Sequence, residues 1–261
     1  RNGLTDEARD DNEVSSDAAI NYRPVEDARL YVRWSRFYRN PFFDENMNFF
    51  HPDNAAMLAP ERGWCVDAGG DYRLLKDFNV GGSVYLTETK NESLYNDLIG
   101  RNFNSPWEIR REGVEAHVGW EREKVAVVNL RYSIISAEFA EGEHKDNTVP
   151  LVPHQQLSLD GRVYVWDEFF VFGGYRYVGD QVLDTDFANA RRQLDAYGLF
   201  NAGCQYAPGY KCLKGFKFTF AVDNLFDKNY CDYAGYGVWT GGDYYYPGAG
   251  RCYTFSVSYT F

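Results

Sequence analysis

Residues 251–261 alternate strictly between two kinds of side chain. Aromatic and aliphatic residues take every second position, and the positions between them carry small side chains, mostly hydroxyls. A period of two puts successive side chains on opposite faces of an extended chain, so this stretch predicts a β-strand with one apolar and one polar face. The apolar positions are Tyr253, Phe255, Val257, Tyr259 and Phe261, and the others are Cys252, Thr254, Ser256, Ser258 and Thr260.

The same alternation recurs along the chain and predicts about 11 antiparallel strands of roughly 10 to 14 residues. Short and long connections alternate between these strands. An outer-membrane β-barrel has short periplasmic turns and long external loops, whereas a β-sandwich has no reason for this regularity. We therefore predict an all-β, antiparallel transmembrane β-barrel meander. The short connections lie near positions 24, 76, 122, 167 and 209, and the long ones near 50, 98, 144, 185 and 237.

Charged residues occupy one face of several predicted strands. In the strand that begins at Trp64, Val66 shares the apolar face, and Asp67 and Asp71 lie opposite. Because charged side chains are costly in lipid, this second face must meet water or a polar lumen. The barrel domain is predicted to cover residues 14–261. Residues 1–13 are acidic and aperiodic, which indicates a loop or a frayed end.

The composition agrees with a barrel that crosses a membrane with strands. Aromatic residues make up 18% of the 261 residues, with 21 Tyr and 19 Phe. No stretch approaches the roughly 18 apolar residues of a membrane helix. Many aromatic residues without a long apolar run suit alternating strands that are bordered by interfacial aromatic girdles.

Charge and cysteine content argue against nucleic-acid-binding and zinc-binding proteins. The formal net charge is −11, and no Lys/Arg cluster interleaves with aromatic residues, which argues against nucleic-acid binding. The five cysteines show no CxxC pair and no Cys/His spacing suited to zinc. An oxidising compartment would permit Cys231 to pair with Cys252, or Cys204 with Cys212, and isolated thiols are the alternative.

Two segments near the C-terminus have a specific composition and order. Residues 224–230 read N-L-F-D-K-N-Y, and residues 246–251 read Y-P-G-A-G-R directly before the terminal aromatic strand. Together they closely resemble the end of TonB-dependent outer-membrane receptors. Further segments that are similar to this family lie at residues 31–41, 59–63, 111–115 and 149–155.

The resemblance implies a fold and a function. Outer-membrane transporters of this kind have about 22 strands, so this chain resembles the C-terminal half of such a barrel. The plug domain, the segment that engages TonB and the first half of the barrel are expected to lie outside it. The implied protein is a receptor in the outer membrane that takes up a scarce ligand, such as an iron–siderophore complex or cobalamin, with no cofactor in the barrel. Implied partners are the TonB complex, through the missing N-terminal region, that ligand, and membrane lipid and lipopolysaccharide.

In such receptors, side chains of the loops and the upper lumen recognise the ligand. Aromatic faces suit planar or catecholate ligands, and an arginine would attract an anionic chelate. The alternative is that these residues belong to the upper aromatic girdle or pack the loops. The candidates are Tyr38, Arg39 and Phe42 on one predicted loop, and Trp239, Tyr244 and Tyr245 on the last.

Other readings of the sequence find less support. The four histidines, His51, His117, His144 and His154, accompany no nucleophile motif, so we predict no catalytic residue and no enzyme. The spacing of the acidic residues Glu141, Glu143 and Asp146 is not that of the Gly-punctuated loop of a dedicated calcium site, so no metal site is predicted. A passive outer-membrane pore or a structural barrel is the alternative function if these residues are the whole product.

Overall fold

The computed structural model describes residues 12–46, 57–96, 100–237 and 241–261. Within these ranges the chain is all-β and forms one sheet of 11 strands and two sheets of 2 strands. No helix in the described part of the chain has the length and apolar character needed to cross a membrane.

The large sheet is an antiparallel meander in which each strand pairs with its neighbours in the chain, apart from four short loop strands. This confirms the predicted fold class. Its strands are β1 (Ser16–Val25), β2 (Ala28–Arg39), β3 (Glu61–Leu75), β4 (Phe78–Lys90), β7 (Ile109–Arg122), β8 (Ala126–Phe139), β9 (Gln155–Trp166), β10 (Phe169–Val178), β11 (Tyr197–Tyr206), β12 (Phe216–Asp223) and β15 (Cys252–Tyr259).

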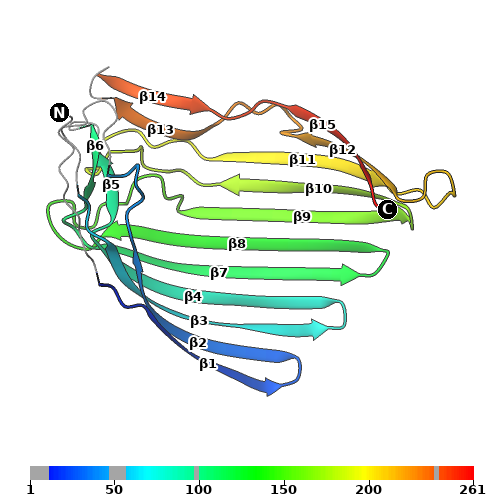
Figure 1. Ribbon diagram of the computed structural model, residues 1–261, viewed down its shortest axis with the longest axis horizontal. Coiled ribbons are helices and arrows are strands. Elements are labelled where there is room, and N and C mark those ends of the chain that lie inside the picture. The colour runs from blue at the N-terminus through cyan, green and yellow to red at the C-terminus, as the bar shows by residue number, and fades with distance from the viewer. Residues whose placement is uncertain (1–11, 47–56, 97–99, 238–240) are drawn as a thin grey trace.

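Short turns and long connections leave opposite ends of the sheet, as the sequence predicts. Two residues separate β1 from β2, β3 from β4 and β9 from β10. The long connections gather at the other end, to the left in Figure 1. The loops that could meet a ligand are therefore all at one end of the sheet.

Two hairpins inside the long connections are additions to the predicted strands. One pairs β5 (Ser93–Asn96) with β6 (Arg101–Asn104), and the other pairs β13 (Cys231–Gly237) with β14 (Gly242–Pro247). The first falls in a stretch predicted to be a polar loop. Strands as short as S-L-Y-N and R-N-F-N offer too few apolar positions for a period of two to be recognised.

The first strand continues through position 24, where a short connection is predicted. It runs to Val25, and the register with β2 shifts between Tyr22 and Val25. Proline cannot donate to a ladder, but it is tolerated at a bulge or in an edge strand. Pro24 occupies both, because β1 pairs with β2 alone.

The register of the ladders sorts the side chains onto two faces. Val66 lies opposite Trp34 on one neighbouring strand and opposite Leu86 on the other. Glu115 lies opposite Ser83 in the same way. Because side chains alternate along each strand, one face of the sheet is mainly apolar and the other mainly polar.

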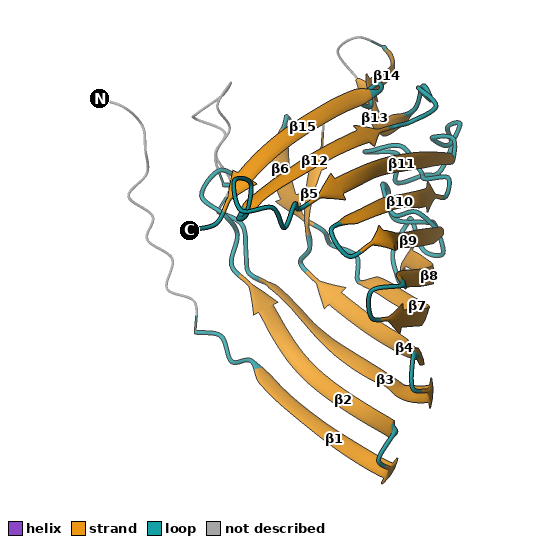
Figure 2. Ribbon diagram, turned by 90° about the vertical axis from the view of Figure 1, so that its right-hand side faces the viewer, coloured by secondary structure: helices purple, strands orange, loops and turns teal. Residues whose placement is uncertain are grey.

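The polar face is the concave one. The sheet is strongly curved, and the β5–β6 hairpin lies on its inner side (Figure 2). Leu94 of that hairpin packs against a buried cluster that includes Ile109 and Phe139. Ile109 has the same parity in β7 as Glu115, so Glu115 and the polar face line the inside of the curve.

The wall has no dry core of its own. Phe255 of β15 is 68% exposed, and every residue of β15 is exposed. The two small sheets lie within the long connections, so no second sheet covers the apolar face among the described residues. The sandwich alternative is thereby excluded.

Burial is concentrated at the loop end instead. One cluster joins the ends of β7 and β8 to Val149, and a second joins Leu183 and Leu194 to Ala234 of β13. These clusters fix the long connections to the inner rim of the sheet.

The two segments that resemble the receptor family connect β12 to β15. The Asn224 side chain donates to the carbonyl oxygens of Lys228 (2.9 Å) and Ala249 (3.1 Å), and it accepts a bond from the Lys228 amide (2.8 Å). The Asp227 carboxylate accepts from the Arg251 amide at 2.9 Å. These bonds close the base of the last long connection and align the terminal strand with β12.

We expect Leu130→Lys to lower the free energy of unfolding in lipid vesicles by about 2–4 kcal/mol, because it puts a cation on the apolar face. Asn129→Lys is the matched control. Asn129 lies on the polar face and donates to Asp160 at 3.1 Å, so a lysine there meets a carboxylate. Unfolding in urea measures both variants, and equal losses would contradict the assignment of the faces.

Candidate functional site

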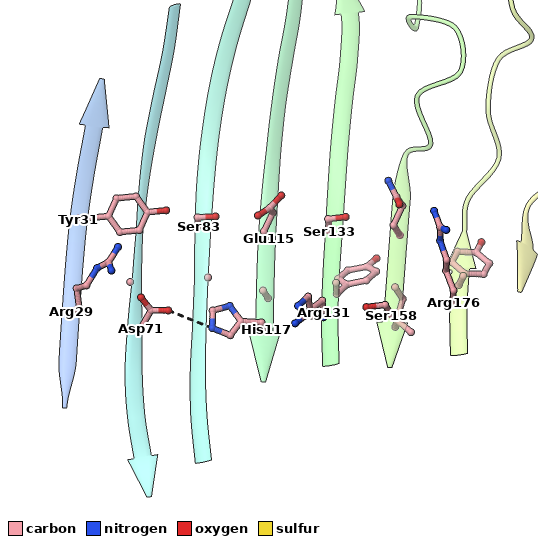
Figure 3. A pocket seen from close by; sticks show the side chains of 17 residues that line it. Arg29, Tyr31, Asp71, Ser83, Glu115, His117, Arg131, Ser133, Ser158 and Arg176 are labelled. Carbon is pink, nitrogen blue, oxygen red and sulfur yellow. Dashed lines mark ion pairs between the residues drawn. The ribbon is translucent and has the colours of Figure 1, made fainter. Parts of the chain in front are cut away.

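A hollow of about 530 Å³ lies on the concave face, across strands β2 to β10 (Figure 3). Its polar side chains come from seven neighbouring strands, because each strand contributes one or two inward residues at this height. The charged residues among them are Arg29, Asp71, Glu115, His117, Arg131 and Arg176, and the hydroxyl-bearing ones include Tyr31, Ser83, Ser133 and Ser158.

Two glycines make room for larger side chains in this wall. A Cβ on Gly81 would lie 2.4 Å from the His117 ring and 2.8 Å from an Asp71 carboxylate oxygen. Gly81 therefore admits the contact between His117 Nε2 and Asp71 Oδ1, which are 3.4 Å apart. A Cβ on Gly69 would similarly meet the Tyr31 ring at 2.9 Å. His117 therefore lies on the concave, polar face, as the alternation along β7 requires.

The arginines of the hollow differ in their partners. Arg131 lies 3.4 Å from the Asp160 carboxylate. Arg29 lies over the Tyr31 ring at 5.3 Å from its centroid. Among the described residues, neither Arg29 nor Arg176 has a carboxylate within ion-pair distance. Such cations attract anionic groups that enter the curve of the sheet.

The first group of predicted ligand contacts is divided by the structure. Tyr38 and Arg39 are the last residues of β2 and not part of the loop, which corrects the prediction. Tyr38 has the parity of Trp34 and so lies on the convex apolar face, where an aromatic girdle is expected. Arg39 points to the concave face, and its guanidinium lies 5.4 Å from the centroid of the exposed Phe42 ring.

Arg39 is held by two carboxylates. Its Nη1 lies 2.8 Å from Glu45 Oε2, and its Nε donates to Glu61 Oε2 at 2.9 Å. Glu61 also accepts from the Ser93 amide at 2.8 Å, so this ion-pair cluster joins β2, β3 and β5. Burial acts to raise the pKa of Glu45, but the bonds from Arg39 and from the Phe42 amide lower that pKa below its ordinary value.

Two residues of the second group, Tyr244 and Tyr245, lie on β14 of the β13–β14 hairpin, at the opposite side of the structure from β2 (Figure 1). Tyr244 lies against Tyr233, with ring centroids 6.1 Å apart. Tyr245 lines a hollow of about 490 Å³ together with Lys228 and Tyr230. Trp239 lies outside the described residues. The described sheet therefore does not bring the two predicted groups together.

Sequence reasoning missed the residues that hold this hairpin. The Tyr233 hydroxyl donates to the Asp184 carboxylate, and burial together with this bond raises the pKa of Tyr233. The Arg191 guanidinium lies 3.3 Å from the Tyr236 ring centroid and 3.0 Å from an Asp243 carboxylate oxygen. These partners are 45 or more positions apart, and no local pattern links them.

The described histidines have structural partners. His144 lies against Trp107 with centroids 4.5 Å apart, and His154 Nδ1 lies 2.9 Å from the Ile135 carbonyl oxygen. His51 falls outside the described residues. No group of three metal-ligating side chains occurs in the part of the chain that the structure describes. All five cysteine thiols are unpaired, so neither open disulfide pairing is formed.

A curved antiparallel sheet with an apolar outer face, a polar inner face and long aromatic loops defines the wall of an outer-membrane-type β-barrel. Within that class, the chain belongs to the TonB-dependent receptors. Residues 1–225 match the family described as TonB dependent receptor-like, beta-barrel. The family and its solved members named below are receptors, which agrees with the expectation that the protein is not an enzyme.

Solved structures share this fold at low sequence identity. The ferric-catecholate import receptor Fiu of E. coli K12, in its closed form, is 19% identical with a TM-score of 0.70, covering 94% of this chain and 34% of that one. The siderophore receptor PiuA of Acinetobacter baumannii is 19% identical (TM-score 0.72; 93% and 35%). The ferric yersiniabactin uptake receptor FyuA of Yersinia pestis is 18% identical (0.73; 94% and 37%). The chain therefore spans about a third of each. A search of curated protein sequences finds no match.

We expect the Arg39 cluster to weaken in acid. Because the pKa of Glu45 is lower in the folded protein, its stabilising effect is present above the ordinary Glu pKa of about 4.3 and is lost as the pH falls through the folded value. Hydrogen exchange of the Phe42 and Glu45 amides measures this. Arg39→Met should lose protection already at pH 7, and unchanged protection in that variant would contradict the role of the cluster.

Proposed function

We propose that this chain is the barrel wall of an outer-membrane receptor that takes up a scarce ligand with energy from the TonB complex. The ligand class is an iron–siderophore complex or a cobalamin. Membership in the TonB-dependent receptor family is the observation that carries the proposal. The import receptors Fiu and FyuA, which share the fold, are named for ferric ligands, and this supports the first class.

The proposal assigns different tasks to parts of the chain. Residues 14–261 would be the barrel domain, and the predicted loop or frayed end at residues 1–13 falls mostly outside the described residues. The TonB complex would be engaged by an N-terminal region outside this chain, and a plug domain would occupy the lumen. The apolar convex face would contact outer-membrane lipid, because exposed aliphatic and aromatic side chains cover most of it.

We propose that the ligand is recognised at the loop end, by aromatic and cationic side chains. Tyr245 is the strongest candidate, because it lines a hollow together with Lys228 and Tyr230. Tyr244, Trp239 and Phe42 are further candidates because of their aromatic side chains. Arg39 would bind an anionic ligand only by competing with its two carboxylate partners. We leave Tyr38 out, because it lies on the convex face.

A passive pore is the second candidate, since a polar concave wall could also line an aqueous channel. Cells that produce the protein distinguish the two functions. A receptor should support growth on a ferric siderophore or on cyanocobalamin only when TonB is present. A pore would pass small solutes in cells without TonB and would conduct ions in planar bilayers. Growth that does not depend on TonB would contradict the proposal that the protein is a TonB-dependent receptor.

We expect Tyr245→Ala to weaken ligand binding by about tenfold or more, because buried aromatic contacts dominate binding energy at many interfaces. Tyr38→Ala is the matched control, since it removes the same ring from the convex face. Titration of the purified protein with ferric catecholate chelates and with cyanocobalamin gives the dissociation constants. Equal affinities of the two variants would remove Tyr245 from the proposed site.

A further inference from the structure

The hollow beside Tyr245 lies between two long connections of the chain. Residues 192–196, in the connection from β10 to β11, form one wall. The other wall includes Tyr245 and Pro247 of β14. The shape of the hollow therefore depends on how firmly the β13–β14 hairpin is held against the β10–β11 connection.

An apolar contact holds the hairpin at the level of the hollow. Leu183 and Leu194 of the β10–β11 connection pack against Ala234 of β13. The Asp184 amide donates to the Ala234 carbonyl oxygen at 2.8 Å. Ala234 is the register partner of Tyr245, so this contact holds the part of the hairpin that carries the Tyr245 ring.

Arg191 makes a second contact, two register positions nearer the tip of the hairpin. Its guanidinium carbon lies 3.3 Å from the centroid of the Tyr236 ring, and its Nη1 lies 3.0 Å from Asp243 Oδ1. Tyr236 and Asp243 are register partners on β13 and β14, so one side chain ties both strands to the β10–β11 connection. We call this contact the Arg191 clamp. The next residue, Arg192, lines the hollow, whereas the Arg191 guanidinium binds the hairpin.

The backbone that carries Arg191 is itself fixed. The buried Asp186 carboxylate accepts from the amides of Ala190 (3.0 Å) and Arg191 (2.9 Å). The Asn189 side chain accepts from the Thr148 amide at 2.7 Å and donates to the Thr148 carbonyl oxygen at 2.9 Å. These bonds attach the segment to the connection between β8 and β9. The clamp therefore holds the hairpin against a support that has little freedom to move.

We propose that Arg191 is a positioning residue for ligand binding, which sets the place of Tyr245 across the hollow from residues 192–196. The inference rests on the proposed function, in which Tyr245 contacts the ligand. A surface that is already ordered binds more tightly than one that must be ordered on binding, because the cost of ordering reduces the binding free energy. Arginine suits this task, since a planar guanidinium can stack on a ring and pair with a carboxylate at the same time.

Hydrogen exchange of the Asp184 amide tests the clamp without ligand, because the bond to Ala234 breaks when the hairpin separates from the connection. Arg191→Met keeps the aliphatic stem but removes the charge and the stacking. It should speed this exchange roughly fivefold to tenfold through more frequent local opening. Arg191→Lys keeps a cation near Asp243 and should recover part of the protection.

Titration with ferric catecholate chelates and with cyanocobalamin tests the effect on binding. Arg191→Met should weaken binding of whichever probe the unchanged protein binds by roughly threefold to tenfold, which is the cost of ordering side chains and loops. Arg191→Lys should lie between the two. The urea midpoint of unfolding should stay the same, since the clamp lies outside the large sheet.

Arg111→Met is the matched control. Arg111 also holds a loop at this end of the sheet, because its Nη1 donates to the Glu92 carboxylate at 2.7 Å next to the β5–β6 hairpin. Removal of this pair should leave both the Asp184 exchange and the affinity unchanged.

Two results would overturn the inference. One is equal exchange of the Asp184 amide in Arg191→Met and Arg111→Met, which would mean that the hairpin does not depend on the clamp. The other is faster exchange with an unchanged dissociation constant, which would mean that the ligand does not depend on the position of the hairpin. If the unchanged protein binds none of the probes, the proposed ligand class fails, and the exchange rates still decide on the clamp.

Discussion

The pairing of backbone N–H and C=O groups is the constraint on which this structure depends. Hydrocarbon offers no water to these groups, so a wall that crosses a membrane must satisfy them within the sheet. The β2–β3 ladder runs unbroken from Ala28 opposite Tyr72 to Arg39 opposite Glu61. With the backbone satisfied in this way, the side chains on both faces need no dry core between two layers. This explains why the wall is ordered although its residues are so exposed.

The side-chain contacts that a globular protein keeps in its centre lie here at one rim. Phe139 and Leu183 are fully buried, and both belong to clusters that fix long connections. The Arg39 cluster and the Tyr233–Asp184 bond act at the same end of the sheet. The loops are therefore attached to the wall by packing and ion pairs as well as by covalent connection. Aromatic side chains on them are held in defined positions, which favours selective binding over loose contact.

The wall could be predicted from the sequence because its information is local. Apolar and polar residues alternate within each strand, and turn lengths alternate between strands, so even the lumenal position of His117 follows. The loop end could not be predicted in the same way. Asp184 and Tyr233 are 49 positions apart, and the β5–β6 hairpin has too few apolar residues for a period to be seen. Tyr38 and Arg39 belong to one predicted group because they are adjacent in sequence, yet adjacent residues of a strand face opposite sides.

The same physics explains how the fold persists at 18% identity to a receptor such as FyuA. A strand of the wall requires only that alternate residues be apolar, and many sequences satisfy this requirement. Stricter demands arise only where side chains bond the backbone, as Asn224 does between Lys228 and Ala249. Segments of that kind carry the family resemblance. The alternation in the strands thus keeps the family fold in the wall, while the loops at its rim can differ from one receptor to another.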